Sequence, residues 1–128
     1  MNTKTYERRV LIVEDSADMR SLLKLILEAE GYSIECRPNG EEALQSLKCS
    51  DVLPDLILLD LRMPIMDGHD FIREIKLLPK LFHIPIVIMS GDYDSEMSQS
   101  FISAGKLLRK PLSIASVIQT VAQNITLH

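Results

Sequence analysis

Short apolar runs alternate with longer amphipathic stretches along the whole chain. Three of the runs contain no charged position and indicate strands with both faces buried, namely Val10–Val13, Leu56–Leu59 and Pro85–Met89. Weaker strand signals follow from the alternation of apolar and polar residues over Ser33–Arg37 and from the short segment Lys106–Arg109. The pattern therefore predicts five strands.

Helical periodicity fills the intervals between these strands. Apolar residues at 19, 22, 23, 26 and 27 form one stripe, and Gly31 follows as a stop signal. Asn39, Asp67 and Ser113 each precede an apolar stripe at a position typical of a helix N-cap. The expected helices are Ala17–Glu30, Asn39 to about Lys48, Asp67 to just before Pro79, Ser95–Ala104 and a closing helix that begins at Ser113.

Strands that alternate with helices predict right-handed crossovers and a parallel sheet covered on both faces. We therefore expect an α/β fold, a flavodoxin-like (βα)5 doubly wound sandwich with strand order 2-1-3-4-5. No linker or composition shift divides the sequence, so residues 1–128 should form a single domain with its core at about 9–124. This size suffices for a hydrophobic core without disulfides.

Composition narrows the class of function. The net charge is −4, with 14 Lys and Arg against 18 Asp and Glu, which argues against nucleic-acid binding through a basic patch. Apolar runs are only a few residues long, so no membrane span is expected. The N-terminus lacks the apolar stretch of a signal peptide, and the two cysteines, Cys36 and Cys49, suggest no disulfide framework. We expect a cytoplasmic location.

Polar side chains follow four of the expected strands. Glu14 and Asp15 come after the first strand, Asp60 after the third, Ser90 after the fourth and Lys110 after the fifth. Ligands of open parallel sheets bind outside the carboxyl ends of the strands, where the strand order reverses. In the flavodoxin-like order the first and third strands are neighbours, so the three acids should converge.

Three converging carboxylates repel one another and need a cation. At about 5 Å and an effective dielectric constant of about 20, each pair costs roughly 3 kcal/mol. Carboxylate oxygens suit Mg²⁺, which keeps several of its waters. With the ammonium of Lys110 and the hydroxyl of Ser90 added, the group would suit a phosphoryl ligand.

Each of these residues also has a simpler interpretation. Asp15 could be a helix cap or turn former, Ser90 with Gly91 a plain turn, and Lys110 an exposed lysine before a helix-starting proline. All of these interpretations would have to hold at one edge of one sheet. Their coincidence there favours a functional site.

The same residues resemble a known family. The pair Glu14-Asp15, the pattern Asp-x-x-Met-Pro-x-x-Asp-Gly over residues 60–68, Ser90-Gly91 and Lys110-Pro111 resemble the receiver domain of two-component response regulators, of the stand-alone chemotaxis-receiver type. The resemblance covers about Arg9 to Asn124.

The resemblance implies a role for each site residue. Asp60 would be the phosphoacceptor, attacking a phosphohistidine to form an aspartyl phosphate. Asp15 and Asp60 would bind Mg²⁺ directly, Glu14 through a water molecule and Arg62 through its backbone carbonyl. Lys110 would pair with one phosphoryl oxygen and Ser90 would donate to another. Met63-Pro64 and Asp67-Gly68 would shape the loop after the third strand.

Two positions depart from the family's pattern. Leu107 stands where the family usually has an aromatic residue three positions before the Lys-Pro lysine, and Tyr93 is a candidate substitute. The sequence Ala104-Gly105-Lys106 places the glycine late, which predicts a shortened or reshaped connection before the last strand. The usual coupling between an aromatic side chain and the Ser90 hydroxyl is therefore not expected in its ordinary form.

Three functions remain open. The first is a phospho-accepting signalling module, with self-phosphorylation and autodephosphorylation chemistry rather than metabolic activity. The second is a binding-only receiver, which Leu107 leaves possible. The third is a small Mg²⁺-dependent phosphatase with Asp60 as nucleophile, although Arg62 occupies the place where such enzymes carry a second acid.

For the first of these functions, the implied phosphodonor is a sensor histidine kinase or histidine phosphotransfer protein. The downstream protein target is unknown, and homodimerisation would use the face of the fourth helix, last strand and last helix. Direct binding to nucleic acid or to a membrane is not expected.

Overall fold

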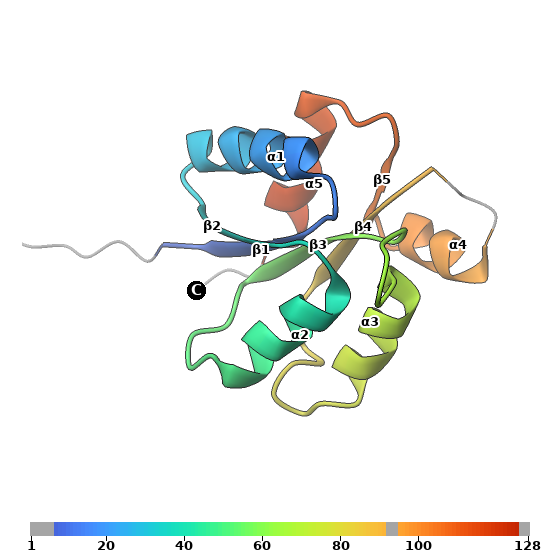
Figure 1. Ribbon diagram of the computed structural model, residues 1–128. Coiled ribbons are helices and arrows are strands. Elements are labelled where there is room, and N and C mark those ends of the chain that lie inside the picture. Colours follow the sequence, from blue (N-terminus) through green and yellow to red (C-terminus); the bar gives the residue numbers. More distant parts are fainter. Residues whose placement is uncertain (1–6, 92–94, 126–128) are drawn as a thin grey trace, which may run out of the picture.

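The computed structural model describes residues 7–91 and 95–125 of the 128-residue chain. Its parallel sheet has the strand order β2-β1-β3-β4-β5, which confirms the expected flavodoxin-like topology (Figure 1). Each strand is followed by a helix, so the carboxyl ends of the strands share one edge. The strands are β1 (Arg9–Val13), β2 (Ser33–Arg37), β3 (Leu56–Asp60), β4 (Ile86–Ser90) and β5 (Leu107–Arg109).

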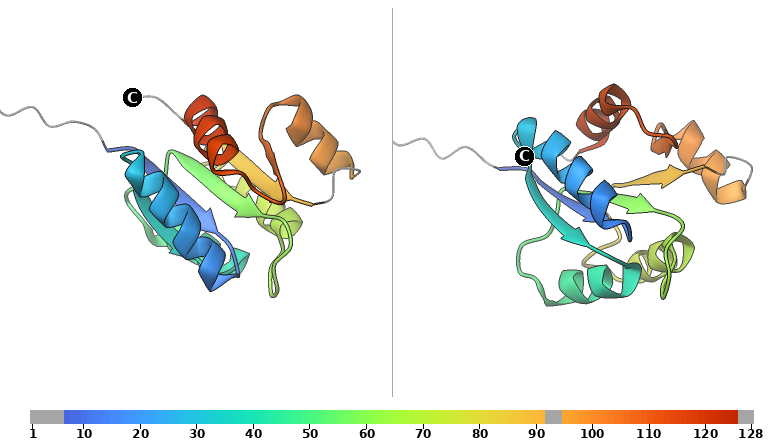
Figure 2. Two further views of the ribbon diagram at one scale, coloured as in Figure 1. Left: turned by 90° about the horizontal axis from the view of Figure 1, so that it is seen from above. Right: turned by 45° about the horizontal axis from the view of Figure 1, so that its top comes forward.

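The helices cover both faces of the sheet. Figures 1 and 2 show α1 and α5 on one face and α2 and α3 on the other, with α4 beside the β4–β5 edge. No described helix is both long enough and apolar enough to cross a membrane. The helices are α1 (Ala17–Ala29), α2 (Gly40–Cys49), α3 (Gly68–Lys76), α4 (Glu96–Ser103) and α5 (Ile114–Asn124).

The sheet separates two apolar clusters. Alternate residues of β1 point to opposite faces, so Leu11 and Val13 pack with α2 and α3 whereas Val10 and Ile12 pack with α1 and α5. Every residue of β3 and β4 is buried, which explains the unbroken apolar runs in the sequence. The sheet is thereby fixed from both sides, and so is the position of the edge that carries the polar residues.

Side-chain caps set the starts of the helices. The side chains of Asn39, Asp67 and Ser113 accept bonds from backbone N–H groups in the first turn, as expected. The capping interpretation of Asp15 is wrong, because the side chain of Ser16 caps α1 by accepting from the N–H of Met19 at 3.3 Å. Asp15 is thus available for another role.

The connection after α4 begins with a glycine that terminates the helix. Gly105 has φ of 71° and lies directly after the C-cap Ala104. Its N–H donates to the carbonyl of Ile102, and the N–H of Lys106 donates to that of Phe101. These two bonds form the Schellman motif that Gly31 also makes after α1. The late glycine therefore terminates the helix, and β5 begins at Leu107 instead of Lys106.

Candidate functional site

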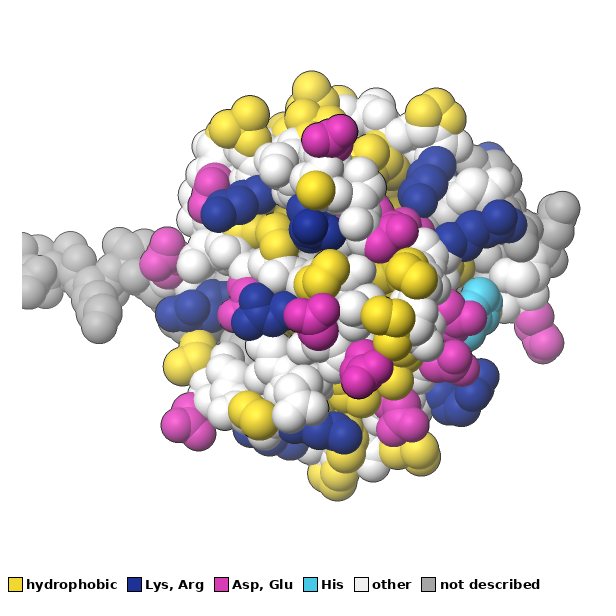
Figure 3. Space-filling view, in the orientation of Figure 1, with side chains coloured by type: hydrophobic (Ala, Val, Ile, Leu, Met, Phe, Trp, Pro, Cys, Tyr) yellow, Lys and Arg dark blue, Asp and Glu magenta, His cyan; other side chains and the backbone are white. Residues whose placement is uncertain are grey.

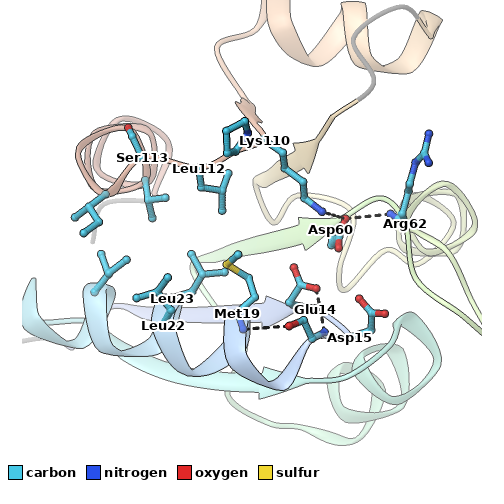
Figure 4. Close-up of a pocket in the computed structure, with 15 residues that line it drawn as sticks. Glu14, Asp15, Met19, Leu22, Leu23, Asp60, Arg62, Lys110, Leu112 and Ser113 are labelled. Atoms are coloured by element: carbon cyan, nitrogen blue, oxygen red, sulfur yellow. Dashed lines mark hydrogen bonds and ion pairs between the residues drawn. The ribbon is translucent and has the colours of Figure 1, made fainter.

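Three carboxylates meet at the carboxyl ends of β1 and β3. These strands are neighbours, with Val13 paired to Leu59, so the residues that follow them lie side by side. One oxygen from each of Glu14, Asp15 and Asp60 lies within 4.8 Å of the others. Glu14 and Asp60 are each 3% exposed, whereas Asp15 faces solvent. The convergence expected from the sequence is thus present (Figure 4).

Backbone and side-chain donors hold the two buried acids in place. The N–H of Ser16 donates to Glu14 Oε2 at 3.1 Å, and the N–H of Arg62 donates to Asp60 Oδ1 at 3.1 Å. Lys110 Nζ also donates to Asp60 Oδ1, at 3.0 Å. Asp60 therefore has both a fixed orientation and a cationic partner, which comes from the residue directly after β5.

Burial makes Glu14 reluctant to ionise. Loss of hydration raises the pKa of its carboxyl to about 7, and the nearby charge of Asp60 adds to the rise. The bond from the N–H of Ser16 acts in the opposite direction without cancelling the effect. The acid cluster is therefore unfavourable when fully charged, which is the electrostatic condition that a divalent cation relieves.

Lys110 and Ser90 come from the ends of adjacent strands. The backbone N–H of Lys110 donates to the carbonyl of Ser90 at 3.0 Å, which ties the residue after β5 to the last residue of β4. Ser90 is 4% exposed and follows Met89, the β4 partner of Asp60 in the sheet register. Figure 4 shows the Lys110 side chain reaching toward Asp60, while that of Arg62 points away from the acids. Only the backbone of Arg62 faces the cluster.

A comparison against known families agrees with the fold. The sequence pattern of the response regulator receiver domain matches residues 10–122. The chain belongs to this family. Its fold is that of a receiver domain.

Individual relatives span different lengths. A 14.6 kDa protein from the sodA1 3' region of Leptolyngbya boryana is 34% identical over 116 residues, which are 89% of this chain and 87% of that protein. The sensor histidine kinase TmoS of Ectopseudomonas mendocina is 34% identical over 93% of this chain, but the match spans only 12% of TmoS. The chemotaxis protein CheY4 of Vibrio cholerae is 26% identical, with a TM-score of 0.80 over 92% of this chain and 98% of that one.

An apolar groove that sequence analysis missed extends from the receiver's acid cluster. It has a volume of about 520 Å³ and runs between α1 and the start of α5. Leu22 and Ile114 are 46% and 59% exposed on its two sides, although Leu22 belongs to the apolar stripe of α1. The groove is lined by Met19, Leu22, Leu23 and Ile26 of α1 and by Leu112, Ile114 and Val117, with the site residues at one end.

The departure at Leu107 has a structural counterpart. Leu107 is half-buried and packs against the apolar cluster that also receives Met97 and Phe101 of α4. Leu107, which stands at the position of the usual aromatic residue, is therefore part of the apolar packing between β5 and α4. Tyr93, the candidate substitute, lies outside the described residues.

Proposed function

We propose that this receiver takes a phosphoryl group onto Asp60 from a phosphohistidine of a sensor histidine kinase or histidine phosphotransfer protein. The observation that supports this most strongly is the surroundings of Asp60. Its carboxylate lies among two further acids and accepts a bond from the Lys110 ammonium at 3.0 Å. A buried carboxylate between a cation site and a lysine can act as a nucleophile toward phosphorus.

The transfer balances without a further reactant. An oxygen of Asp60 forms a bond to phosphorus as the bond between phosphorus and the imidazole nitrogen breaks, and the histidine leaves with the electron pair and is protonated. The bonds from Arg62 and Lys110 both end on Oδ1, so Oδ2 is the oxygen that can attack without either bond being broken first. The product is an aspartyl phosphate, whose hydrolysis returns the domain to its starting state.

The donor set fits Mg²⁺. Asp15 and Asp60 would bind the ion directly, Glu14 through water and Arg62 through its backbone carbonyl. Hard carboxylate oxygens within 4.8 Å of one another, two of them in buried residues, match the preference of this ion. When bound, Mg²⁺ neutralises charge on the phosphoryl oxygens.

The existing ion pair limits the size of the switch. New charge-assisted bonds from Ser90 and Lys110 would each contribute about 1.5–3 kcal/mol. Lys110 already contacts Asp60, so phosphorylation redirects this bond rather than creating it. The new contribution rests mainly on Ser90 and falls short of the roughly 5.5 kcal/mol that moves a population from 1:99 to 99:1. We therefore expect a partial population shift.

The groove between α1 and α5 supplies a docking place for the phosphodonor. A histidine must approach Asp60 closely, and this groove is the apolar surface continuous with the acid cluster. Leu22 and Ile114 would pack against an amphipathic helix that carries the phosphohistidine. The output partner, or a second copy of the chain, would instead use the α4–β5–α5 face, where Leu107 lies.

The cysteines and the surface charges bear on the cellular location. Cys36 and Cys49 are free thiols, which suits a reducing compartment. On the face shown in Figure 3, basic and acidic side chains are interspersed, so that face offers no single-sign patch for nucleic acid. We therefore place the protein in the cytoplasm, as a signalling module that acts through protein partners.

Incubation with Mg²⁺ and acetyl phosphate, followed by intact mass measurement, tests this function. We expect one added phosphoryl group, which disappears in Asp60→Ala and in the presence of a chelator. Asp67→Asn is a matched control, because Asp67 caps α3 and an asparagine retains the cap.

Three other outcomes would contradict the proposal. A folded wild-type protein that gains no phosphoryl group would be a binding-only receiver. An adduct that persists in Asp60→Ala would place the phosphoacceptor elsewhere. Sustained turnover of small phosphate esters would instead identify a phosphatase.

A further inference from the structure

Arg20 makes a contact that the phosphorylation chemistry does not use. It is the fourth residue of α1 and is half-buried. Its Nη1 donates to the backbone carbonyl of Glu14 at 2.7 Å and to that of Asp15 at 3.0 Å. One guanidinium nitrogen thus joins two consecutive carbonyls of the segment that carries two of the three acids.

The position of Arg20 is unfavourable for α1 itself. A cation near a helix N-terminus opposes the helix dipole, which favours negative charge there. The guanidinium therefore needs other partners, and the two carbonyls provide them. Charged donors make stronger hydrogen bonds than neutral ones, so these contacts restrain the backbone between β1 and α1.

By restraining this backbone, Arg20 also restrains the directions in which the side chains of Glu14 and Asp15 point. Glu14 is also held by its own N–H, which donates to the carbonyl of Arg37 at 3.1 Å, and through its carboxylate by the N–H of Ser16. Asp15 is exposed, and α1 begins two residues after it. The bond from Arg20 to the Asp15 carbonyl is therefore a direct constraint on how the Asp15 backbone turns toward the cluster.

We propose that Arg20 is a positioning residue that preorganises Glu14 and Asp15 for a divalent cation. The inference rests on the proposed Mg²⁺ site. Without Arg20, ordering of the turn would have to accompany ion binding, which weakens affinity. At saturating Mg²⁺ the turn would be ordered even without Arg20, and phosphoryl transfer to Asp60 would proceed at its usual rate.

The test compares Arg20→Met with Lys24→Met. Lys24 lies one turn later on α1 and is exposed, so its replacement removes the same charge from the same helix. Loss of positive charge near three acids should, by itself, strengthen cation binding. We expect Arg20→Met to bind Mg²⁺ about 10–100-fold more weakly, the usual range for loss of a group that orients metal ligands. Lys24→Met should bind as tightly as wild type or slightly tighter.

Three readouts separate positioning from general damage. Mg²⁺ affinity, measured by calorimetry, should fall in Arg20→Met, whereas phosphorylation by acetyl phosphate at saturating Mg²⁺ should stay within about twofold of wild type. Amide exchange of residues 15–17 should speed up in the metal-free variant. Arg20→Lys keeps a charged donor and should recover part of the lost affinity.

The outcomes distinguish this inference from the proposed function. Equal Mg²⁺ affinities of Arg20→Met and Lys24→Met would overturn the positioning role, and so would a lower rate at saturating Mg²⁺ with unchanged affinity. Should Arg20→Met fail to fold, Arg20→Gln takes its place with the same expectation. A wild-type protein without measurable Mg²⁺ binding would contradict the proposed function itself.

Discussion

The two sides of the sheet edge that carries Asp60 are built differently. On the β1–α1 side, a helix of 13 residues buries Leu23 and Leu27 and carries the turn that holds Glu14 and Asp15. On the β4–β5 side, α4 has eight residues and its one fully buried side chain is Ser98, while β5 has only three residues. Apolar packing anchors α1, whereas α4 and β5 bury fewer residues and are less firmly packed.

The difference separates two tasks within one site. The acids need fixed geometry before any ligand arrives, and apolar burial of α1 provides it. Lys110 and Ser90 lie on the side with the shorter strand and the more polar helix. Fewer buried contacts have to be broken there when a modification of Asp60 moves these residues. We infer that the β1–α1 side keeps the acids in fixed positions and that the α4–β5 side changes conformation when Asp60 is modified.

The largest expected contrast is in stability. Leu27→Ala removes a fully buried side chain of α1 and should lower the free energy of unfolding by about 2–5 kcal/mol. Met97→Ala removes a side chain of similar size from α4, but Met97 is only half-buried, so about 1 kcal/mol is expected. Urea denaturation measures both. Equal losses would remove the distinction between the two sides.

A smaller effect concerns the pH dependence of the metal-free protein. The pKa of Glu14 is raised from 4.5 to about 7 by burial, so the folded state holds a proton that the unfolded state has lost between these values. The contribution of Glu14 to stability therefore declines as pH rises through this window and is least favourable above it. Glu14→Gln should remove that decline and stabilise the protein at pH 8 by about 3 kcal/mol, since each pKa unit between 4.5 and about 7 corresponds to about 1.4 kcal/mol.

Thermal unfolding between pH 5 and pH 8 in chelated buffer measures the effect. Glu28→Gln, at an exposed position of α1, controls for loss of a negative charge. A wild-type profile that is parallel to that of Glu14→Gln would show that Glu14 does not titrate in this range. Saturating Mg²⁺ should reduce the difference between the two proteins, because the ion favours the charged carboxylate.

A similarly small change in stability is expected for Lys110→Ala. The lysine is 36% exposed, so its bond to Asp60 is partly screened and should contribute only about 1 kcal/mol. The circular dichroism spectrum should be unchanged, while phosphorylation should alter amide exchange in α4 and β5 less than it does in wild type. Global unfolding of Lys110→Ala would instead show that the lysine is structural, and a preserved exchange response would remove it from the switch.

Much of this fold could be predicted from the sequence because its strands are buried on both faces. Continuous apolar runs marked β1, β3 and β4, and the helix caps at Asn39, Asp67 and Ser113 marked where helices begin. Expected element boundaries differ from the observed ones mostly by a residue. Placement of the acids followed from strand order, since neighbouring parallel strands end at the same edge.

The features that the sequence did not reveal depend on how distant elements pack. Leu22 belongs to the apolar stripe of α1, but the position of α5 leaves it 46% exposed at the rim of a groove. Arg20 resembles any solvated helical arginine until its two carbonyl partners are known. Asp15 and Ser16 are both good caps, and only the backbone geometry shows that Ser16 takes the role.

The location of the phosphoryl group tests the central claim most directly. After reaction with acetyl phosphate and Mg²⁺, tryptic digestion should place the modification on the peptide that ends at Arg62, and fragmentation should assign it to Asp60. A phosphoryl group found instead on Asp15 or Ser90 would contradict the account, because the anchored acids and the lysine would then surround a residue that performs no chemistry.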